Sequence, residues 1–332
     1  MRILALETSC DETACAIVED GWKVHANVIA SSLDLHKITG GVVPEIAARA
    51  QIESIIPVIK QTLEQSGFDH ADLDAIAVTT EPGLVTSLLV GTETAKWLGY
   101  LWNKPVISVN HIHGHVYANW LERDPATDPI VFPIISLSVS GGHNELILLK
   151  NHQEWEVIGE SQDDAAGEAF DKVARILGLG YPGGPEIEQH ASKFVRTENV
   201  LKMPRAWLNT NPGHHGDWDQ KNFDFSFSGL KSEVLREVQR RGELTDQDRI
   251  EISHAFQEAV FDVLVTKLLG AAKIHQAKEI HIAGGVSANK RLQEIVGARL
   301  GAFVPEVKFR WPEKMVYCTD NASMIAAAGY FA

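Results

Sequence analysis

The stretch Val106–Tyr117 reads VISVNHIHGHVY, a short strand-forming run followed directly by three histidines in five positions. If a helix begins near Asn110, His111 and His115 stand four residues apart on one helix face. His113 then points to roughly the opposite side. Two imidazoles at this spacing can bind one metal ion. A hydrogen-bonded interior pair or a solvent-facing pair of histidines would give the same pattern.

The same stretch argues against a zinc protease. The protease signature places a glutamate directly after the first histidine, where it acts as the general base. Here Ile112 holds that position, and its side chain can neither accept a proton nor orient a water molecule. A metal site on this helix would therefore lack the base that proteolysis needs.

The composition is typical of a globular protein. Of its residues, 45% are hydrophobic and 22% are charged. The length of 332 residues suits about two domains. The net charge of −14 disfavours indiscriminate binding to nucleic acid or to anionic membranes, so such a partner would need a local basic patch. Three cysteines without a C-x-x-C pair indicate a reducing compartment. With no signal peptide and no apolar stretch of about 18 residues, we expect a cytoplasmic protein without a membrane partner.

Outward from the histidines, one strand pattern occurs twice. Each half shows a strand, a turn, two further strands, and later a strand that ends in a glycine-containing turn before a helix. The first strands contain Ile3 and Ile134, and the later strands contain Ile76 and Ile280. Ile76 follows Ile3 by 73 residues, whereas Ile280 follows Ile134 by 146 residues. The second half therefore carries 73 additional residues between its first and its later strand.

This pattern predicts a duplicated α/β fold with two similar domains that face each other across a cleft. The first domain is expected at residues 1–127 and the second at residues 128–332. The additional residues predict a largely helical insertion in the second domain, at about 160–242.

Two glycine turns follow predicted strands, Ser140-Gly-Gly142 and Gly284-Gly-Val-Ser-Ala-Asn289. Glycines let backbone N–H groups approach an anion, and the second turn precedes a helix whose N-terminus favours phosphate. A tight hairpin for the first turn and a helix cap by Ser287 for the second are the alternatives. Together the two turns favour a nucleotide in the cleft.

Acidic residues provide two more candidate groups. Asp164, Glu168 and Asp171 fall at i, i+4 and i+7, which predicts an acidic stripe on one helix face. A solvated helix face is the ordinary explanation, although the small residues between them also permit close approach of a backbone or a ligand. Asp11 and Glu12 follow the first strand, where they could bind a cation, position a nucleophile or hydrogen-bond their own turn.

The predicted insertion differs in charge from the rest of the chain. From Lys193 to Arg241, nine Lys or Arg residues stand against six Asp or Glu residues, a balance of +3 that leaves −17 elsewhere. A basic region on an acidic protein favours contact with nucleic acid phosphates. We expect Arg240 and Arg241 to contribute to such a contact.

Eight motifs occur in one order along the chain. They are Glu7-Thr-Ser-Cys-Asp-Glu-Thr13, Asn110–His115, Ser138–His143, Asp163–Lys172, Tyr181–Gly184, Phe225–Lys231, Gly284–Asn289 and Cys318-Thr-Asp-Asn321. In these motifs the chain closely resembles the bacterial TsaD family, formerly described as O-sialoglycoprotein endopeptidases, from Met1 to nearly the last residue. The resemblance implies a fold of the actin, hexokinase and Hsp70 type (ASKHA).

The resemblance implies an enzyme, a tRNA N6-adenosine threonylcarbamoyltransferase. Such an enzyme transfers the threonylcarbamoyl group from threonylcarbamoyl-AMP to N6 of the adenosine just 3′ of the anticodon (position 37). The acceptors are tRNAs that read codons starting with A, and the product is t6A. The implied protein partners are a catalytically silent TsaB-like paralogue and a small TsaE-like ATPase. The alternatives are an ATP-dependent kinase of the same superfamily, which leaves the histidine pair unexplained, and a non-catalytic nucleotide-binding scaffold.

The resemblance also implies particular site residues. One iron or zinc ion per subunit would be held by His111, His115 and Asp320. Substrate contacts would come from Ser138, Val139, Ser140, Gly141 and Gly142, with Asp171, Gly184 and Asn289 contacting the adenylate or its threonyl part. No general base is identified, and Asp11 and Glu12 remain the candidates.

Two departures from the family pattern concern three positions, Glu81 and Thr86 in one segment and Ser138 in another. Glu81-Pro-Gly-Leu-Val-Thr86 stands where the family usually has Gly-Pro-Gly-Leu-Val-Gly, which could alter the turn or a surface that faces a partner. Ser138 stands where archaeal and eukaryotic relatives have a metal-binding tyrosine. Because a serine hydroxyl is a poor metal ligand, the fourth metal position is expected to be open to substrate or water.

Overall fold

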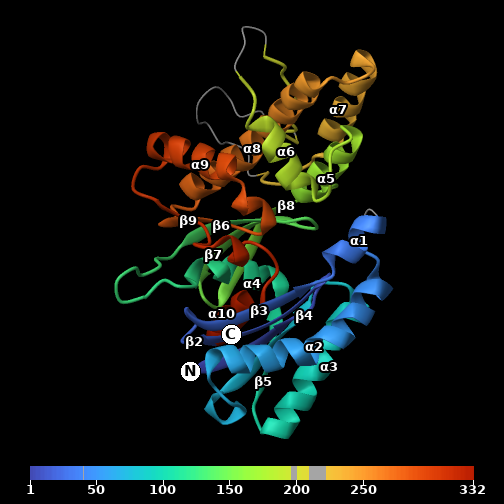
Figure 1. Cartoon of the computed structure of the whole chain (residues 1–332). Coiled ribbons are helices and arrows are strands. Elements are labelled where there is room, and N and C mark those ends of the chain that lie inside the picture. Colours follow the sequence, from blue (N-terminus) through green and yellow to red (C-terminus); the bar gives the residue numbers. More distant parts are fainter. Residues whose placement is uncertain (40, 196–199, 209–221) are drawn as a thin grey trace. The chain divides into compact units, whose positions relative to one another are not determined.

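A computed structural model describes residues 1–39, 41–195, 200–208 and 222–332 of the protein (Figure 1). Its contacts divide the chain into two compact units. Unit 1 comprises Met1–Ile130 with Trp311–Ala332, and unit 2 comprises Val131–Arg310. Among the described residues, no helix is both long and apolar enough to cross a membrane.

Unit 1 contains a five-stranded sheet in the order β3-β2-β1-β4-β5. The strands are β1 (Arg2–Glu7), β2 (Glu12–Glu19), β3 (Lys23–Ser31), β4 (Ala75–Glu81) and β5 (Val106–Asn110). β2 pairs antiparallel with β1 and β3, whereas β4 pairs parallel with β1 and β5. β1 and β2 are nearly continuous runs of buried residues, as expected for strands covered on both faces.

Helices cover both faces of this sheet (Figure 1). α2 (Pro44–Ser66) and α3 (Val85–Trp102) pack on the face that contains Ile76 and Val78. Ala77 points to the other face, because side chains alternate along a strand, and there it meets α10 (Ala322–Phe331). The remaining helical segments of unit 1 are α1 (Leu33–Thr39), η1 (His70–Asp72), α4 (His111–Tyr117), η2 (Ala118–Trp120) and η4 (Met315–Tyr317).

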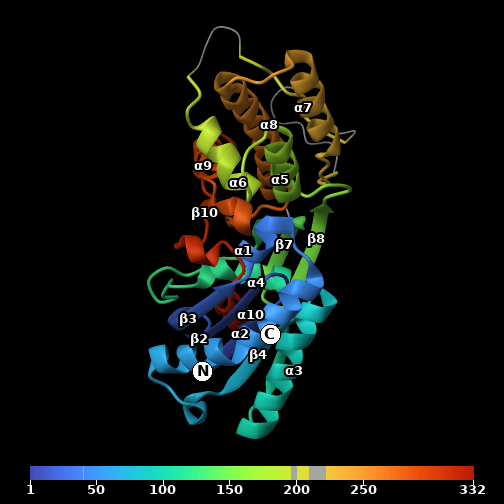
Figure 2. The same ribbon diagram turned by 45° about the vertical axis from the view of Figure 1, so that its right-hand side comes forward.

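Unit 2 repeats the sheet, in the order β10-β9-β6-β7-β8. The strands are β6 (Ile134–Val139), β7 (Asn144–Asn151), β8 (Glu154–Glu160), β9 (Glu279–Ala283) and β10 (Lys308–Arg310). The helices are α5 (Ala166–Ile176), α6 (Gly183–Ala191), α7 (Ser228–Arg241), α8 (Asp246–Ile274), η3 (Gly285–Ala288) and α9 (Lys290–Phe303). Figure 2 shows α5, α6 and α7 gathered beside α8, which itself packs on β6 and β9.

The predicted duplication is confirmed by the two sheets. Replacing β1–β5 by β6–β10 reproduces the strand order and every strand orientation. The equivalent strands are the ones that the sequence pattern matched, because Leu4 pairs with Ile76 and Ile135 pairs with Ile280. The three helices α5, α6 and α7 lie between β8 and α8, in the interval where the sequence predicts the insertion.

The C-terminal segment differs from the expected division of the chain. The sequence analysis assigned everything from residue 128 onward to the second domain, but Trp311–Ala332 belongs to unit 1. The physical reason is α10, in which residues 322–329 are all buried against the first sheet and α4. Phe331 also stacks on Tyr117 with ring centroids 5.1 Å apart.

A glycine in α10 tests this packing. A Cβ at Gly329 would lie 2.9 Å from the Ala77 Cβ, whereas a Cβ at Gly297 in α9 would meet nothing within 4 Å. Gly297→Ala should therefore stabilise the protein by up to about 1 kcal/mol through helix propensity. Gly329→Ala should destabilise it by about 1–3 kcal/mol through overpacking. Urea unfolding of both variants measures the difference, and equal stabilisation would show that α10 is loosely packed.

Candidate metal site and substrate-binding turns

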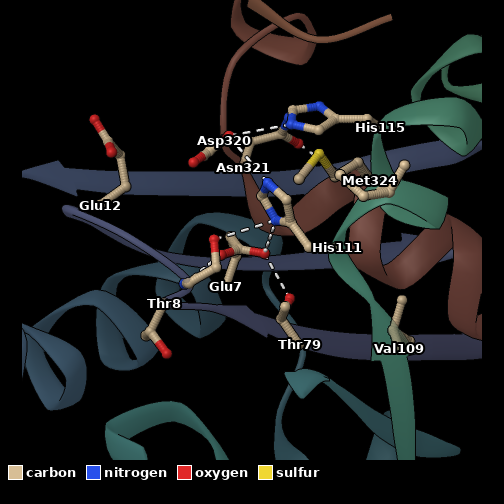
Figure 3. Close-up of polar contacts among 12 residues, drawn as sticks. Glu7, Thr8, Glu12, Thr79, Val109, His111, His115, Asp320, Asn321 and Met324 are labelled. Atoms are coloured by element: carbon tan, nitrogen blue, oxygen red, sulfur yellow. Dashed lines mark hydrogen bonds and ion pairs between the residues drawn. The ribbon is translucent and has the colours of Figure 1, made fainter. Parts of the chain in front are cut away.

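Two histidines and one aspartate meet in unit 1 (Figure 3). Asn110 caps α4, as its Oδ1 accepts hydrogen bonds from two N–H groups of the first turn (2.9 and 3.3 Å), so the predicted helix start is confirmed. His111 and His115 are thus one turn apart. Asp320, just before α10, has Oδ1 3.5 Å from Nε2 of His111 and 3.2 Å from Nε2 of His115. The candidate ligand atoms of the three residues all lie within 4.8 Å of one another.

The surroundings of His115 fit a bound metal ion. Its side chain is 1% exposed, and neither ring nitrogen makes a hydrogen bond with a described residue. The contact between Nε2 and Asp320 is short, but it lies outside hydrogen-bond geometry. Buried polar atoms without a partner are rare in folded proteins, and an ion between the imidazoles and the carboxylate would engage Nε2 of His115. Nitrogen and oxygen donors of this kind suit a divalent transition metal.

Glu7 orients His111, a role that the sequence analysis missed. Glu7 is fully buried at the end of β1, and its Oε2 lies 3.1 Å from Nδ1 of His111. The hydroxyl of Thr79 and the N–H of Ser9 also donate to this carboxylate. With Nδ1–H directed at Glu7, Nε2 is the ring nitrogen left for a metal, as in other metal sites where a carboxylate supports a histidine ligand. The available signal was a charged residue that ends a buried apolar strand.

Charges near His111 reinforce this arrangement. Burial alone would raise the pKa of Glu7, but His111 outweighs burial and lowers it. Burial alone would likewise lower the pKa of His111, but Glu7 and Asp320 outweigh burial and raise it to about 9. Without a cation, the histidine therefore carries a proton between two carboxylates. A metal ion would replace that positive charge.

The candidate bases Asp11 and Glu12 lie in the turn after β1 and at the start of β2. Burial, reinforced by Asp11 and Asp320, raises the pKa of Glu12 to about 9. Its carboxyl group is consequently protonated at neutral pH, and its Oε1 accepts a hydrogen bond from Ser31 (3.0 Å). Burial and the neighbouring carboxylates thus disfavour the charged form of Glu12 in the absence of a cation.

In unit 2, Ser140–Gly142 forms the tight hairpin between β6 and β7. The N–H of Ser140 donates to the carbonyl of His143 (2.8 Å), and its hydroxyl accepts from the N–H groups of Gly142 and His143 (3.3 and 3.1 Å). A Cβ at Gly141, Gly142 or Gly184 would meet nothing within 4 Å, and none of the three has a left-handed φ. The fold itself does not require glycine there, so the bare backbone leaves room for a ligand.

Gly167, in contrast, is required by packing. Its N–H donates to the carbonyl of Ser140 (3.1 Å), and a Cβ there would lie 2.5 Å from that oxygen. The first turn of α5 thus rests directly on the hairpin. The predicted close approach at the small residues of this motif is confirmed as a contact between two backbones.

The other predicted substrate residues are held by the fold. Ser138 and Val139 are buried in β6, and the Ser138 hydroxyl has no hydrogen-bond partner among the described residues. The Oδ1 of Asp171 accepts from the N–H of Gly183 (2.7 Å) at the start of α6, and burial raises the pKa of Asp171. Asn289, and not Ser287, caps α9.

The acidic stripe predicted on one helix is wrong at its first member. α5 begins at Ala166, so Asp164 precedes the helix. Lys172 and Lys231 bind the Asp164 carboxylate at 2.6 and 2.7 Å, and Lys172 also binds Glu168 at 2.8 Å. Burial would raise the pKa of Asp164, but the two lysines outweigh burial and lower it. The Asp164 and Glu168 carboxylates are therefore neutralised by lysines of this chain, whereas no lysine pairs with Asp171 among the described contacts.

The structure shows ion pairs at Arg240 and Arg241, and the predicted RNA contact of these two residues stays a prediction. The Arg241 side chain is 15% exposed and binds Glu237, Asp248 and Glu251 at 2.6–2.8 Å. Arg240 makes two hydrogen bonds to Glu237 (2.7 and 2.8 Å). Arg241 is thus held by carboxylates of α7 and α8, whereas the Arg240 side chain is 69% exposed and its surface ion pair is a weak one.

Glu7 provides a test of the metal site. Glu7→Gln keeps the side-chain volume but removes the charge that holds His111, so we expect zinc affinity to fall by about 10–100-fold. Competition with a chromophoric chelator measures this affinity. The control Glu53→Gln changes an exposed carboxylate on α2 and should bind zinc like the wild type. Equal affinity in both variants would remove Glu7 from the site.

Comparisons with known proteins agree with the family resemblance. The TsaD model, described as tRNA N6-adenosine threonylcarbamoyltransferase, matches residues 23–327. The chain is 46% identical to the protein of that name from Bacillus subtilis, over 100% of this chain and 90% of the relative. It is 47% identical to the one from Geobacillus kaustophilus, over 98% of this chain and 90% of the relative.

Solved structures support the fold alone. Full-length HypF matches with a TM-score of 0.62 at 14% identity, over 99% of this chain and 54% of HypF. Component A of the (R)-2-hydroxyglutaryl-CoA dehydratase of Acidaminococcus fermentans matches with a TM-score of 0.54 at 15% identity, over 99% of this chain and 98% of that one. The fold is thus the duplicated ASKHA fold that the resemblance implied. By sequence, the chain belongs to the TsaD family of tRNA N6-adenosine threonylcarbamoyltransferases.

Proposed function

We propose that this protein transfers the threonylcarbamoyl group of threonylcarbamoyl-AMP to N6 of adenosine 37 in tRNAs that read codons starting with A. The observation that carries the proposal beyond family membership is the donor set of the buried His111 and His115 with the partly exposed Asp320. An ATP-dependent kinase of the same superfamily would need a base and Mg²⁺, and it would have no use for two imidazoles at this position. The tRNA acceptor would place the reaction in the cytoplasm.

His111, His115 and Asp320 would together hold one iron or zinc ion. Such an ion, with three protein ligands and an open coordination position, would supply Lewis acidity toward substrate oxygens. Glu7 would keep the Nδ1 proton of His111 in place, so that Nε2 stays available as a ligand.

In unit 2, the residues proposed to bind the adenylate would act largely through backbone groups. The bare turn at Gly141 and Gly142 would approach the adenylate closely, because no side chain stands between its backbone and the ligand. Asp171, beside the start of α6, would accept a hydrogen bond from a ribose or threonyl hydroxyl. The side chain of Asn289 is already engaged with α9 and Gln257, so this residue would act by shaping its turn.

The chemistry demands positioning more than covalent catalysis. The mixed anhydride already carries its activation in the AMP leaving group, so no covalent enzyme intermediate is needed. The protein must hold the carbamoyl carbon near N6 of an unstacked adenine. We expect a TsaB-like paralogue and a TsaE-like ATPase to take part, as the family resemblance implies.

The decisive experiment combines the purified protein with threonylcarbamoyl-AMP, the two accessory proteins and tRNA. Mass spectrometry of the digested nucleosides should detect t6A. A kinase would instead consume ATP and leave the tRNA unmodified. If no modified adenosine forms with metal-loaded protein, the transferase proposal is refuted.

Removal of single ligands tests the metal assignment. His111→Ala and Asp320→Ala should each lower bound iron or zinc, with affinity reduced by more than about tenfold, because these losses are more severe than those of outer-shell partners. Transfer activity should fall with the metal content. The control His113→Ala lies on the same helix but outside the donor set, and it should keep its metal. Elemental analysis of the purified variants gives the answer, and full metal in both ligand variants contradicts the assignment.

Asp171→Asn tests the adenylate contact. The amide retains an oxygen that can accept from Gly183, so stability should change by less than about 0.5 kcal/mol. Affinity for a non-hydrolysable adenylate analogue should fall by about 1.5–3 kcal/mol, typical of a lost hydrogen bond to a charged group. Calorimetric titration beside a thermal melt separates the two effects, with the exposed Asp246→Asn as control. A much lower melting temperature with normal binding would make Asp171 purely structural.

A further inference from the structure

Unit 2 contains a cavity of about 630 Å³ whose lining comes from α8, α9 and the chain that follows α6. None of the predicted substrate residues lines it. Part of its wall, including Phe194, Lys202 and Arg205, belongs to the region that carries a positive charge balance in the sequence. The cavity is therefore a candidate site in unit 2 at which that region would bind an anionic ligand.

An aromatic pair forms one wall of the cavity. Phe194 and His254 stack nearly parallel, with ring centroids 4.1 Å apart and an interplanar angle of 8°. Burial lowers the pKa of His254, so the imidazole is neutral at pH 7. Unpaired nucleobases are commonly bound on such flat surfaces, because every base has a π-face.

The cations of the cavity differ in their availability. Arg205 binds Asp262 (3.0 Å) and the carbonyl of Met203 (2.6 Å). Arg291 donates two hydrogen bonds to the Glu258 carboxylate (2.7 and 3.0 Å). Lys202, by contrast, is exposed and makes no hydrogen bond or ion pair with any described residue.

This charge pattern favours one kind of ligand. Among the described residues that line the cavity, Asp262 and Glu258 pair with the two arginines, and Lys202 adds one further positive charge. A single phosphodiester carries one negative charge and matches it. A free nucleoside triphosphate carries about four negative charges, and most of them would find no counter-charge here.

We propose that this cavity docks one unpaired nucleotide of the tRNA, with the base on the Phe194–His254 surface and the phosphate at Lys202. The proposal rests on the proposed function, because it takes tRNA as the acceptor. It assigns an RNA contact to Lys202 and the aromatic pair, separate from the contact predicted at Arg240 and Arg241. The nucleotide docked here is distinct from the reacting adenosine, since no predicted substrate residue reaches the cavity.

Three variants of the full chain test this assignment in tRNA filter binding over a range of salt concentrations. Lys202→Glu should weaken binding by about tenfold and reduce the log–log salt slope by about 0.7–0.9, the value for one lost phosphate contact. Phe194→Leu keeps an apolar side chain but removes the stacking surface, so binding should weaken by about fivefold with the slope unchanged. Lys278→Glu makes the same charge change at an exposed lysine outside the cavity, and it should bind within about twofold of the wild type.

The outcomes are distinguishable. If Lys202→Glu and Phe194→Leu bind tRNA like Lys278→Glu, and thermal melts show all three folded, the cavity does not contact tRNA. If the two cavity variants instead lose binding of AMP while tRNA binding is unchanged, the cavity is a mononucleotide site and the proposal is wrong. If the wild-type protein, with its accessory proteins, binds no tRNA at all, the proposed function fails and this inference falls with it.

Discussion

The packing of α10 against the first sheet is the constraint on which the candidate metal site depends. Asp320 immediately precedes this helix, and it reaches the two histidines of α4 because α10 lies against α4 and β1. Glu7, at the end of β1, completes the arrangement from the sheet itself. Three segments far apart in the sequence thus supply the ligands and their support. The position of Asp320 relative to the two histidines therefore depends on the apolar contacts of α10 with the first sheet and α4.

In unit 2, contacts between backbone segments hold the predicted substrate-binding residues in place. Its predicted substrate-binding turn is supported by backbone contacts, and the first turn of α5 rests on Ser140 at a position where only glycine fits without a shift. The Asp163–Lys172 motif, which contains this first turn of α5, begins with Asp163. The Asp163 carboxylate accepts hydrogen bonds from Ser226 and Phe227, just before α7. Motifs that are separate in the sequence therefore form one connected support. A substitution in the insertion, near Ser226 or Phe227, can consequently shift the Ser140–Gly142 turn through these contacts without any contact with a ligand.

The sequence predicted what local periodicity encodes. Buried runs and turns identified both sheets, and helical spacing put His111 and His115 on one face. Asp320 came only from the family resemblance, because nothing local indicates that a distant aspartate folds back beside them. The ion pairs of Arg241 could not be predicted for a similar reason, since Asp248 and Glu251, which bind it, lie on a different helix. The helix boundary after Asp164 was missed because small residues extend the apparent pattern.

The order of the chain has a consequence for synthesis. Unit 1 includes both Met1–Ile130 and Trp311–Ala332, so all of unit 2 is translated before unit 1 can be completed. Until α10 emerges, the sheet face that contains Ala77 has no helix from the C-terminal segment to cover it, and such apolar surface favours aggregation in nascent chains. The nascent protein would therefore acquire its second unit first. The histidines of α4 would meet their aspartate only among the last events of folding.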